Sequence, residues 1–222
     1  MSWLRDIERK IEERLEGKVG GGNMHALEAA RVIDHLLADN RFSPSGAFTL
    51  VPSLILVPAR SEATLPPEFE AEVERLVASA MKERGYQPLV PFKVRILPYE
   101  SGRRDILACW VDGGNRPING IIEAVEGPAK GSLWGIGEDG CVLGRGDDVQ
   151  VRLIDPGVSR RHLKLQVLRG ELCVEDLGSH NGTHLGKRQL TQPVLVKSGS
   201  KLSLGASVIR VWLLPAVSSG RR

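Results

Sequence analysis

Three short segments in the second half of this 222-residue chain carry groups that could bind a phosphate. Their guanidinium, hydroxyl and amide groups, and the backbone N–H groups that glycines expose, nearly all donate hydrogen bonds or carry positive charge. Such donors on neighbouring loops are what a phosphate dianion requires. We therefore predict a phosphate-binding site. The segments are Gly144-Arg145, Ser159-Arg160-Arg161-His162 and His180-Asn181-Gly182-Thr183.

Ser159 and His162 could instead belong to a hydrolase, in which a serine nucleophile is activated by a histidine. No G-x-S-x-G nucleophile elbow surrounds Ser159, however. A serine three residues from a histidine is also commonplace. We expect no enzymatic activity and no catalytic residue.

The segment Gly135–Gly140 matches the G-x-G-x-x-G pattern of dinucleotide-binding loops. Such a loop needs a strand before it and a helix after it. Here β-type residues and another turn follow, so we predict a hairpin loop and no cofactor.

The three cysteines and five histidines are scattered, and no C-x-x-C pair occurs. This arrangement argues against a metal site. An odd number of cysteines fits a reducing compartment, and the charged N-terminus lacks the apolar core of a secretory signal. No apolar run of about 18 residues occurs, so we expect a cytoplasmic protein without membrane insertion.

The elements that must position the three segments follow from the spacing of apolar residues. From residue 119 to 215, short apolar runs recur every 8 to 12 residues between Gly, Asp, Asn and Pro. This spacing is typical of an all-β sandwich and places the three segments on loops between strands.

Residues 1–112 show helical spacing instead. An apolar stripe runs through residues 3–15, a second helix is expected after Asn23, and a third follows Pro66-Pro67 and ends at Gly85. Strands are expected at 54–57, 92–96 and 106–111, the last two paired as a hairpin. We predict an α+β N-terminal domain (1–112), a linker (113–118), the β-sandwich (119–215) and a disordered tail (216–222).

The net charge of +3 is unevenly divided between the halves. Residues 1–117 carry 16 basic and 17 acidic side chains, a balance of −1, and the remainder carries 14 and 10, a balance of +4. Gly17-Lys18-Val19-Gly20 could be the G-x-x-G clamp of an RNA-binding KH module. The first half has no room for the strand that should precede that clamp, and its charge disfavours nucleic acid.

The three segments resemble the motif of the forkhead-associated (FHA) domain, which is G-R, then S-x-x-H, then N-G and a small residue. The resemblance covers roughly residues 119–215 and implies an eleven-stranded sandwich that binds phosphothreonine peptides. It implies that Arg145 and Ser159 bind the phosphate, that Arg160 adds a contact, and that Asn181 bonds the peptide main chain. His180 stands where the family often has threonine, and it is also expected to contact the peptide. Gly144, His162, Gly182 and Thr183 would be structural.

The first half resembles a domain that precedes FHA domains in bacterial proteins of the FhaA type. Together the two resemblances imply an adaptor in bacterial Ser/Thr-kinase signalling, linked to cell-envelope or division control. Its partner would be a phosphothreonine-containing kinase, pseudokinase or kinase substrate. The alternative is a structural or nucleic-acid-associated protein without phospho-dependent binding. Thr64 is a candidate phosphorylation site within the chain itself.

Overall fold

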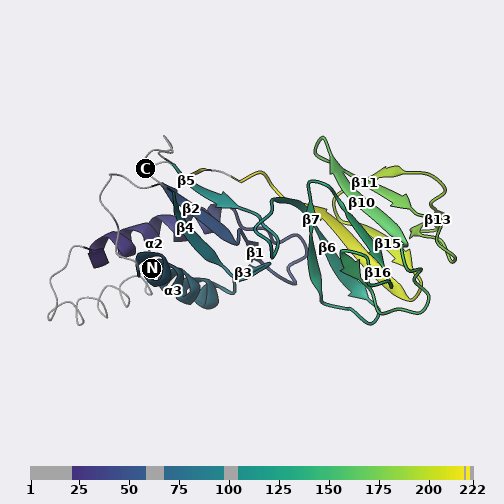
Figure 1. Cartoon of the computed structure of the whole chain (residues 1–222), viewed down its shortest axis with the longest axis horizontal. Helices are drawn as coiled ribbons and strands as arrows, with labels where there is room; N and C mark the ends of the chain where they lie inside the picture. Colours follow the sequence, from purple (N-terminus) through teal and green to yellow (C-terminus); the bar gives the residue numbers. More distant parts are fainter. Residues whose placement is uncertain (1–21, 59–67, 98–104, 218, 221–222) are drawn as a thin grey trace.

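The computed structural model of the chain has two parts that lie end to end (Figure 1). It describes residues 22–58, 68–97, 105–217 and 219–220. The predicted first helix, the Gly17–Gly20 segment and Thr64 lie outside the described residues. Within the described ranges, no helix is long and apolar enough to cross a membrane.

The first part is an α+β domain, as predicted. Apolar side chains at helical spacing on both helices pack on one face of a small sheet, in a core that includes Ile33, Val73 and Ile55. Gly85 ends the helix predicted after Pro66-Pro67 in the left-handed conformation, and the N–H groups of Gly85 and Tyr86 donate to carbonyls of its last turn. The elements are α2 (Gly22–Asp39), β1 (Leu50–Val51), β2 (Leu54–Pro58), α3 (Phe69–Arg84), β3 (Gln87–Pro88), β4 (Lys93–Leu97) and β5 (Ile106–Cys109).

The sheet order corrects the predicted pairing of the last two strands. β2 is central, with β4 parallel on one side and β5 antiparallel on the other, so β4 and β5 are not a hairpin. The crossover through α3 returns the chain beside β2 as a parallel strand, which leaves the opposite side of β2 for β5. On β4, the N–H groups of Val94 and Ile96 donate to the carboxylates of Glu74 and Glu70 on α3.

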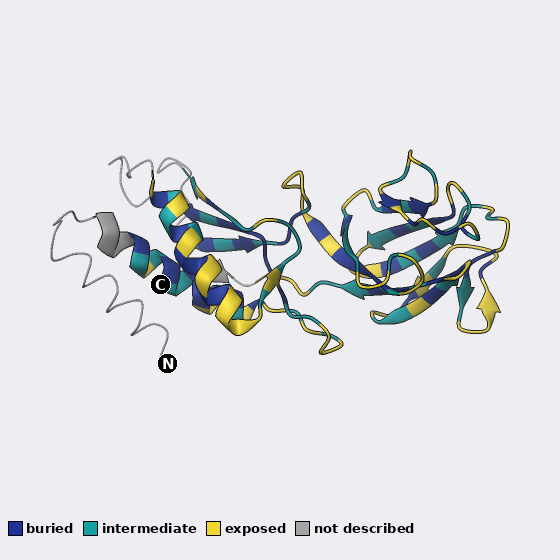
Figure 2. Cartoon of the chain, turned by 90° about the horizontal axis from the view of Figure 1, so that it is seen from below, coloured by how far each residue is buried: buried dark blue, intermediate teal, exposed yellow. Residues whose placement is uncertain are grey.

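The second part is a β-sandwich of a five-stranded and a six-stranded sheet, which gives the eleven strands that the resemblance implied. Inward-facing residues such as Ile122, Leu165 and Val211 form its core (Figure 2). The five-stranded sheet has the order β14-β11-β10-β8-β9, and the six-stranded sheet has the order β13-β12-β15-β16-β6-β7. The strands are β6 (Ile118–Glu126), β7 (Leu133–Gly137), β8 (Cys141–Gly144), β9 (Val151–Arg152), β10 (Leu163–Leu168), β11 (Glu171–Asp176), β12 (His184–Leu185), β13 (Arg188–Gln189), β14 (Val194–Val196), β15 (Ser200–Leu204) and β16 (Ser207–Leu213).

The G-x-G-x-x-G segment connects these two sheets. Gly135 and Gly137 belong to β7, and Gly140 lies in the turn before β8 with φ at 77°. Because β7 and β8 belong to different sheets, the predicted hairpin is wrong. A Cβ on Gly135 would lie 2.8 Å from Cγ2 of Ile118 on β6, so this glycine has a packing role.

The segment predicted as a linker is an ordered turn between the two parts. The backbone N–H of Ile118 donates to the carbonyl of Trp110, and the Asp112 carboxylate binds Arg116 across the turn. Ile118 was expected in the linker but is buried and begins β6. It joins an apolar cluster shared by both parts, which includes Trp110 and Trp212. This shared cluster makes the connection a packed junction.

The end of the chain also differs from the prediction. Ser219–Gly220, in the tail expected to be disordered, forms β17 and pairs antiparallel with β5. The chain thus returns from the sandwich to the sheet of the first part (Figure 1). Two residues without apolar alternation give no local signal for a strand, since the pairing depends on the free edge of β5.

Candidate phosphate-binding site

The loops that carry the three segments meet at one end of the sandwich. The backbone N–H of Arg145 donates to the carbonyl of Ser159 at 2.9 Å, and that of Gly146 donates to the carbonyl of Arg160 at 3.0 Å. Gly144 allows this approach, because a Cβ there would lie 2.0 Å from the Arg160 carbonyl oxygen. The first two segments therefore form one backbone-bonded unit.

His162 lies beneath this unit with an exposed fraction of 0%. Its Nδ1 accepts from the backbone N–H of Ser159 at 3.1 Å, and its Nε2 lies 3.3 Å from the carbonyl oxygen of Gly182. The acceptor role of Nδ1 places the proton of a neutral ring on Nε2, which donates to Gly182. His162 thus joins the second segment to the third, which supports its assignment as a structural residue.

Asp176 organises the third segment from the end of β11. Its carboxylate accepts from the hydroxyls of Ser179 and Thr183 at 2.7 and 2.6 Å, and from the backbone N–H of Ser179 at 2.8 Å. Burial acts to raise the pKa of Asp176, but these hydrogen bonds outweigh it and the pKa is lowered. Gly182 follows with φ at 72°, where a side chain would be strained and would meet Gln189. This partly buried anion fixes the backbone around Asn181.

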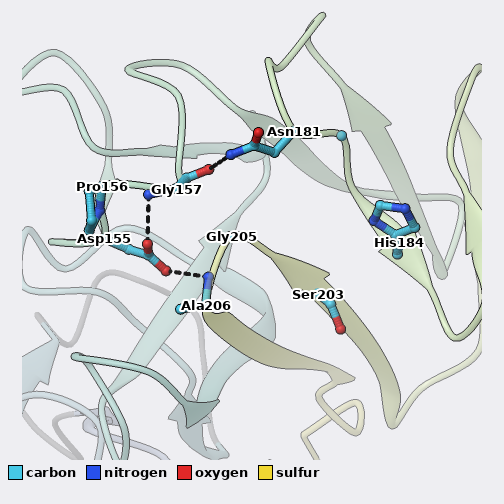
Figure 3. A pocket seen from close by; sticks show the side chains of 9 residues that line it. Asp155, Pro156, Gly157, Asn181, His184, Ser203, Gly205 and Ala206 are labelled. Carbon is cyan, nitrogen blue, oxygen red and sulfur yellow. Dashed lines mark hydrogen bonds between the residues drawn. The ribbon is translucent and has the colours of Figure 1, made fainter.

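Asp155, which precedes the second segment, binds the turn between β15 and β16 (Figure 3). Its carboxylate accepts from the backbone N–H groups of Gly157 and Ala206 at 2.8 and 3.0 Å, and from the Ser207 hydroxyl at 2.6 Å. Burial opposes ionisation, yet these donors lower the pKa of Asp155. Asp, Pro and Gly at positions 155–157 are turn-forming residue types, so the sequence by itself indicates only a local turn here. The partners 51 and 52 residues away could not be inferred from spacing.

The predicted binding residues lie at the solvent-facing surface above these supports. The Ser159 Oγ accepts from the backbone N–H of His180 at 3.0 Å, which leaves its hydroxyl hydrogen free to donate. The Arg145 side chain is exposed, and its Nε donates to the carbonyl of Val158 at 3.3 Å. Arg160 is exposed beside it. The Asn181 Nδ2 donates to the carbonyl of Gly157 at 2.8 Å, so its Oδ1 can accept from a ligand.

A hollow of about 450 Å³ adjoins Asn181 (Figure 3). The only carboxylate that lines it, that of Asp155, is already satisfied by three donors. The hollow therefore suits a small or apolar side chain of a ligand that extends past Asn181. Its lining residues are Asp155, Pro156, Gly157, Asn181, Gly182, His184, Ser203, Gly205 and Ala206.

The site lies at the end of the sandwich opposite the first domain. β6 runs from Ile118 in the shared cluster to Glu126, and β16 runs back from Ser207, which binds Asp155, to the cluster residue Trp212. The site and the junction therefore lie at opposite ends of these two strands. In the described ranges, no group of three or more His, Cys, Asp or Glu residues could hold a metal ion.

The buried imidazole predicts a pH dependence of stability. Burial lowers the pKa of His162 from its ordinary 6.5, and the charge of Asp176 opposes this only in part. Below pH 6.5 the unfolded chain binds a proton that the folded chain does not, so the free energy of unfolding falls as pH falls, by up to about 1.4 kcal/mol per pH unit. Urea unfolding at pH 7.5, 6.5 and 5.5 measures this slope. His162→Gln should flatten the slope, and equal slopes for both proteins would contradict the assignment.

Comparison with known proteins places this site in a family. The sequence model of the FHA domain matches residues 141–205. The FHA domain-containing protein FhaB of Mycolicibacterium smegmatis is 37% identical over 90 residues, which are 40% of this chain and 58% of FhaB. The glycogen accumulation regulator GarA of the same species is 32% identical over 85 residues, 38% of this chain and 53% of GarA. The chain thus spans little more than half the length of these relatives.

Solved structures of FHA domains also resemble part of the chain. One, from a structural and functional analysis of phosphothreonine-dependent FHA domain interactions, is 33% identical, covers 44% of this chain and 99% of its own, and has a TM-score of 0.41. The FhaA FHA domain complexed with the intracellular domain of Rv3910 is also 33% identical, covers 41% and 98%, and has a TM-score of 0.38. From the family match and the sequence relatives, this chain contains a forkhead-associated domain.

Proposed function

We propose that this chain is a phosphothreonine-binding adaptor in bacterial Ser/Thr-kinase signalling. One observation carries the proposal: Arg145, Ser159, Arg160 and Asn181 come together on one surface, and their buried supports are satisfied internally. The site offers several donors to an anion and presents no nucleophile–base pair at hydrogen-bonding distance, because His162 is committed to two backbone groups. We accordingly assign the site a binding function without catalysis. We also propose that the protein acts in the cytoplasm.

Each exposed residue has a separate role in the proposed complex. The Arg145 guanidinium pairs with the phosphate, and the Ser159 hydroxyl donates to a phosphate oxygen, with Arg160 adding a contact to phosphate or peptide. His180 lies exposed next to Asn181 and borders the bound peptide. The Asn181 Oδ1 accepts from a peptide N–H, which holds the ligand extended over the hollow.

The partner is a phosphothreonine-containing protein such as a kinase, pseudokinase or kinase substrate. The relatives FhaB, an FHA domain-containing protein, and GarA, a glycogen accumulation regulator, support a regulatory binding role. The separation between site and junction leaves the first domain free for a second interaction. An adaptor requires two such independent surfaces.

Degenerate peptide libraries test the proposal without knowledge of the partner. The full chain is immobilised and presented with matched libraries in which the central residue is phosphothreonine, phosphoserine or threonine. We expect retention of the phosphothreonine library well above the other two. Equal retention of the phosphorylated and unphosphorylated threonine libraries would instead favour a scaffold with an FHA fold.

Ser159→Ala should weaken phosphothreonine peptide binding about tenfold, since one hydrogen bond to a charged group is worth about 1.5–3 kcal/mol. The variant also leaves the backbone N–H of His180 without its acceptor. Fluorescence anisotropy with a labelled peptide selected from the library measures the change. Ser45→Ala, at an exposed serine of the first domain, is the matched control and should bind as the wild type does. Unchanged affinity in Ser159→Ala would remove Ser159 from the site.

A further inference from the structure

A second hollow, of about 510 Å³, lies where the first domain meets the sandwich. Leu89 and Val90 of the first domain form one wall, and β7 forms another. The turn at residues 112–117, the segment at residues 138–141, and Gln150 and Val151 at the start of β9 complete it. Because its walls come from both domains, which share the cluster around Trp110 and Trp212, the hollow is a fixed feature of the packed junction. We call it the junction groove.

The groove runs beside an unpaired strand edge. β7 is the last strand of the six-stranded sheet, with β6 as its only partner among the described strands. Its residues Leu133, Trp134, Gly135 and Gly137 line the groove. Glycines in a strand leave room for another backbone to approach closely, and a free edge offers unpaired N–H and C=O groups. At Gly137, only the Pro117 carbonyl oxygen, at 3.7 Å, lies within 4 Å of where a Cβ would be.

The groove is acidic in balance. Asp112 and Arg116 neutralise each other, with 2.7 Å between carboxylate and guanidinium. Glu138 and Asp139 are exposed at the end of β7, and neither forms an ion pair within the described ranges. The charge of Asp139 also acts on Arg116, but three carboxylates (Asp112, Glu138 and Asp139) against one guanidinium leave a net negative charge in the groove. This charge lies beside partly buried apolar side chains, those of Leu89, Leu133 and Trp134. A ligand that matches both features combines basic and apolar side chains.

We propose that the junction groove binds an extended segment of a partner protein in which basic and apolar residues alternate, added as a strand to the free edge of β7. The main-chain groups of β7 pair with the segment, the apolar side chains pack on Leu89 and Trp134, and the basic side chains reach Glu138 and Asp139. This mode of recognition uses backbone hydrogen bonds for affinity and alternate side chains for selectivity. It needs no phosphate, and it is separate from the site at the other end of the sandwich.

The junction groove gives the adaptor a second surface for contact with a partner protein. When both segments belong to one partner, the second binding event becomes intramolecular, and the combined affinity rises by orders of magnitude without any new contact. The groove exists only in the chain that contains both domains, because Leu89 and Val90 supply one wall.

The test uses the full chain and a fluorescein-labelled, unphosphorylated six-residue peptide that alternates valine and lysine. Anisotropy should show saturable binding to the wild type, and a valine–glutamate peptide of the same length should bind at least tenfold more weakly. Glu138→Lys/Asp139→Lys should weaken the valine–lysine peptide at least tenfold. The matched control is Glu83→Lys/Glu171→Lys, which changes two other exposed acids by the same charge and should leave binding unchanged. Urea unfolding verifies that both double variants remain folded.

Strand addition is tested by N-methylation. Successive N–H groups of a strand point to opposite edges, so methylation of all valines blocks one edge and methylation of all lysines blocks the other. One methylated peptide should lose at least tenfold in affinity and the other should keep it. No binding of the unmethylated peptide, equal binding by the Glu138→Lys/Asp139→Lys variant, or equal affinities of both methylated peptides would each overturn the proposal. Arg145→Ala should leave this binding unchanged, so the outcome is independent of the phosphothreonine site.

Discussion

Arg145→Ala should reduce the affinity for a phosphothreonine peptide by about tenfold to a hundredfold or more. A charge-assisted hydrogen bond contributes about 1.5–3 kcal/mol, and each 1.4 kcal/mol is a factor of about ten in Kd. The Arg145 side chain makes a single hydrogen bond in the described part of the chain, through Nε to Val158, so its terminal nitrogens are available to the phosphate. Its backbone bond to Ser159 does not involve the side chain, and the loop should persist in the variant.

Two further variants distinguish a specific contact of the Arg145 guanidinium from the effect of its positive charge. Arg145→Lys keeps the positive charge but loses the planar guanidinium fork, so it should recover only part of the affinity. Lys197→Ala removes one exposed charge at the opposite end of the sandwich and should bind as the wild type does. Isothermal titration measures all three proteins with one peptide. Equal losses of peptide affinity in Arg145→Ala and Lys197→Ala would mean that the overall positive charge of the domain, and no specific contact of Arg145, attracts the phosphate.

Gly144→Ala should both destabilise the protein and abolish phosphothreonine binding. The added Cβ would lie 2.0 Å from the Arg160 carbonyl oxygen and 3.0 Å from that of Ser159, and both contacts are with backbone. The loop must move, because a main chain cannot rotate away as a flexible side chain does. Overpacking of this kind costs about 1–3 kcal/mol, and the movement breaks the bonds that join Arg145 to Ser159 and Gly146 to Arg160. Urea unfolding and peptide titration of the same preparation measure the two effects.

Gly137→Ala is the matched control for this steric argument. Gly137 is also a strand glycine of the sandwich, but the nearest atom to an added Cβ is the Pro117 carbonyl oxygen at 3.7 Å, an ordinary contact. This variant should keep the stability of the wild type to within about 0.5 kcal/mol and should bind the phosphothreonine peptide normally. If Gly144→Ala behaved like Gly137→Ala, the close approach of the first two segments would not be needed for the site.

The grouping of the three segments on one surface could be predicted from the sequence because the residue types that suggest it are local. Residue type alone identifies Arg145, Ser159 and Asn181 as donors, and short apolar runs between turns place them on loops of a sandwich. The structure brings these residues together at one end of the sandwich, as that prediction requires. The supporting role expected for His162 also agrees with its burial and its two backbone contacts.

The remaining features depend on contacts that local spacing does not encode. Asp155 binds Ala206 and Ser207, which are more than 50 residues away, and the sequence pattern indicated only a turn. β5 pairs with β2 because α3 places β4 on the other side of β2, a consequence of topology. Ile118 was assigned to a linker because turn residues precede it, but its side chain completes a core formed by both domains.

Calorimetric titration with a single peptide in two states tests the central claim most directly. One library-selected peptide is synthesised with phosphothreonine and with unmodified threonine at the same position, and both are titrated into the full wild-type chain. In the proposed complex several donors bind the phosphate, and each charge-assisted bond is worth about 1.5–3 kcal/mol, so the phosphorylated form should bind at least about a hundredfold more tightly. Equal heats and equal Kd values for the two forms would contradict the assignment of this surface as a phosphothreonine site.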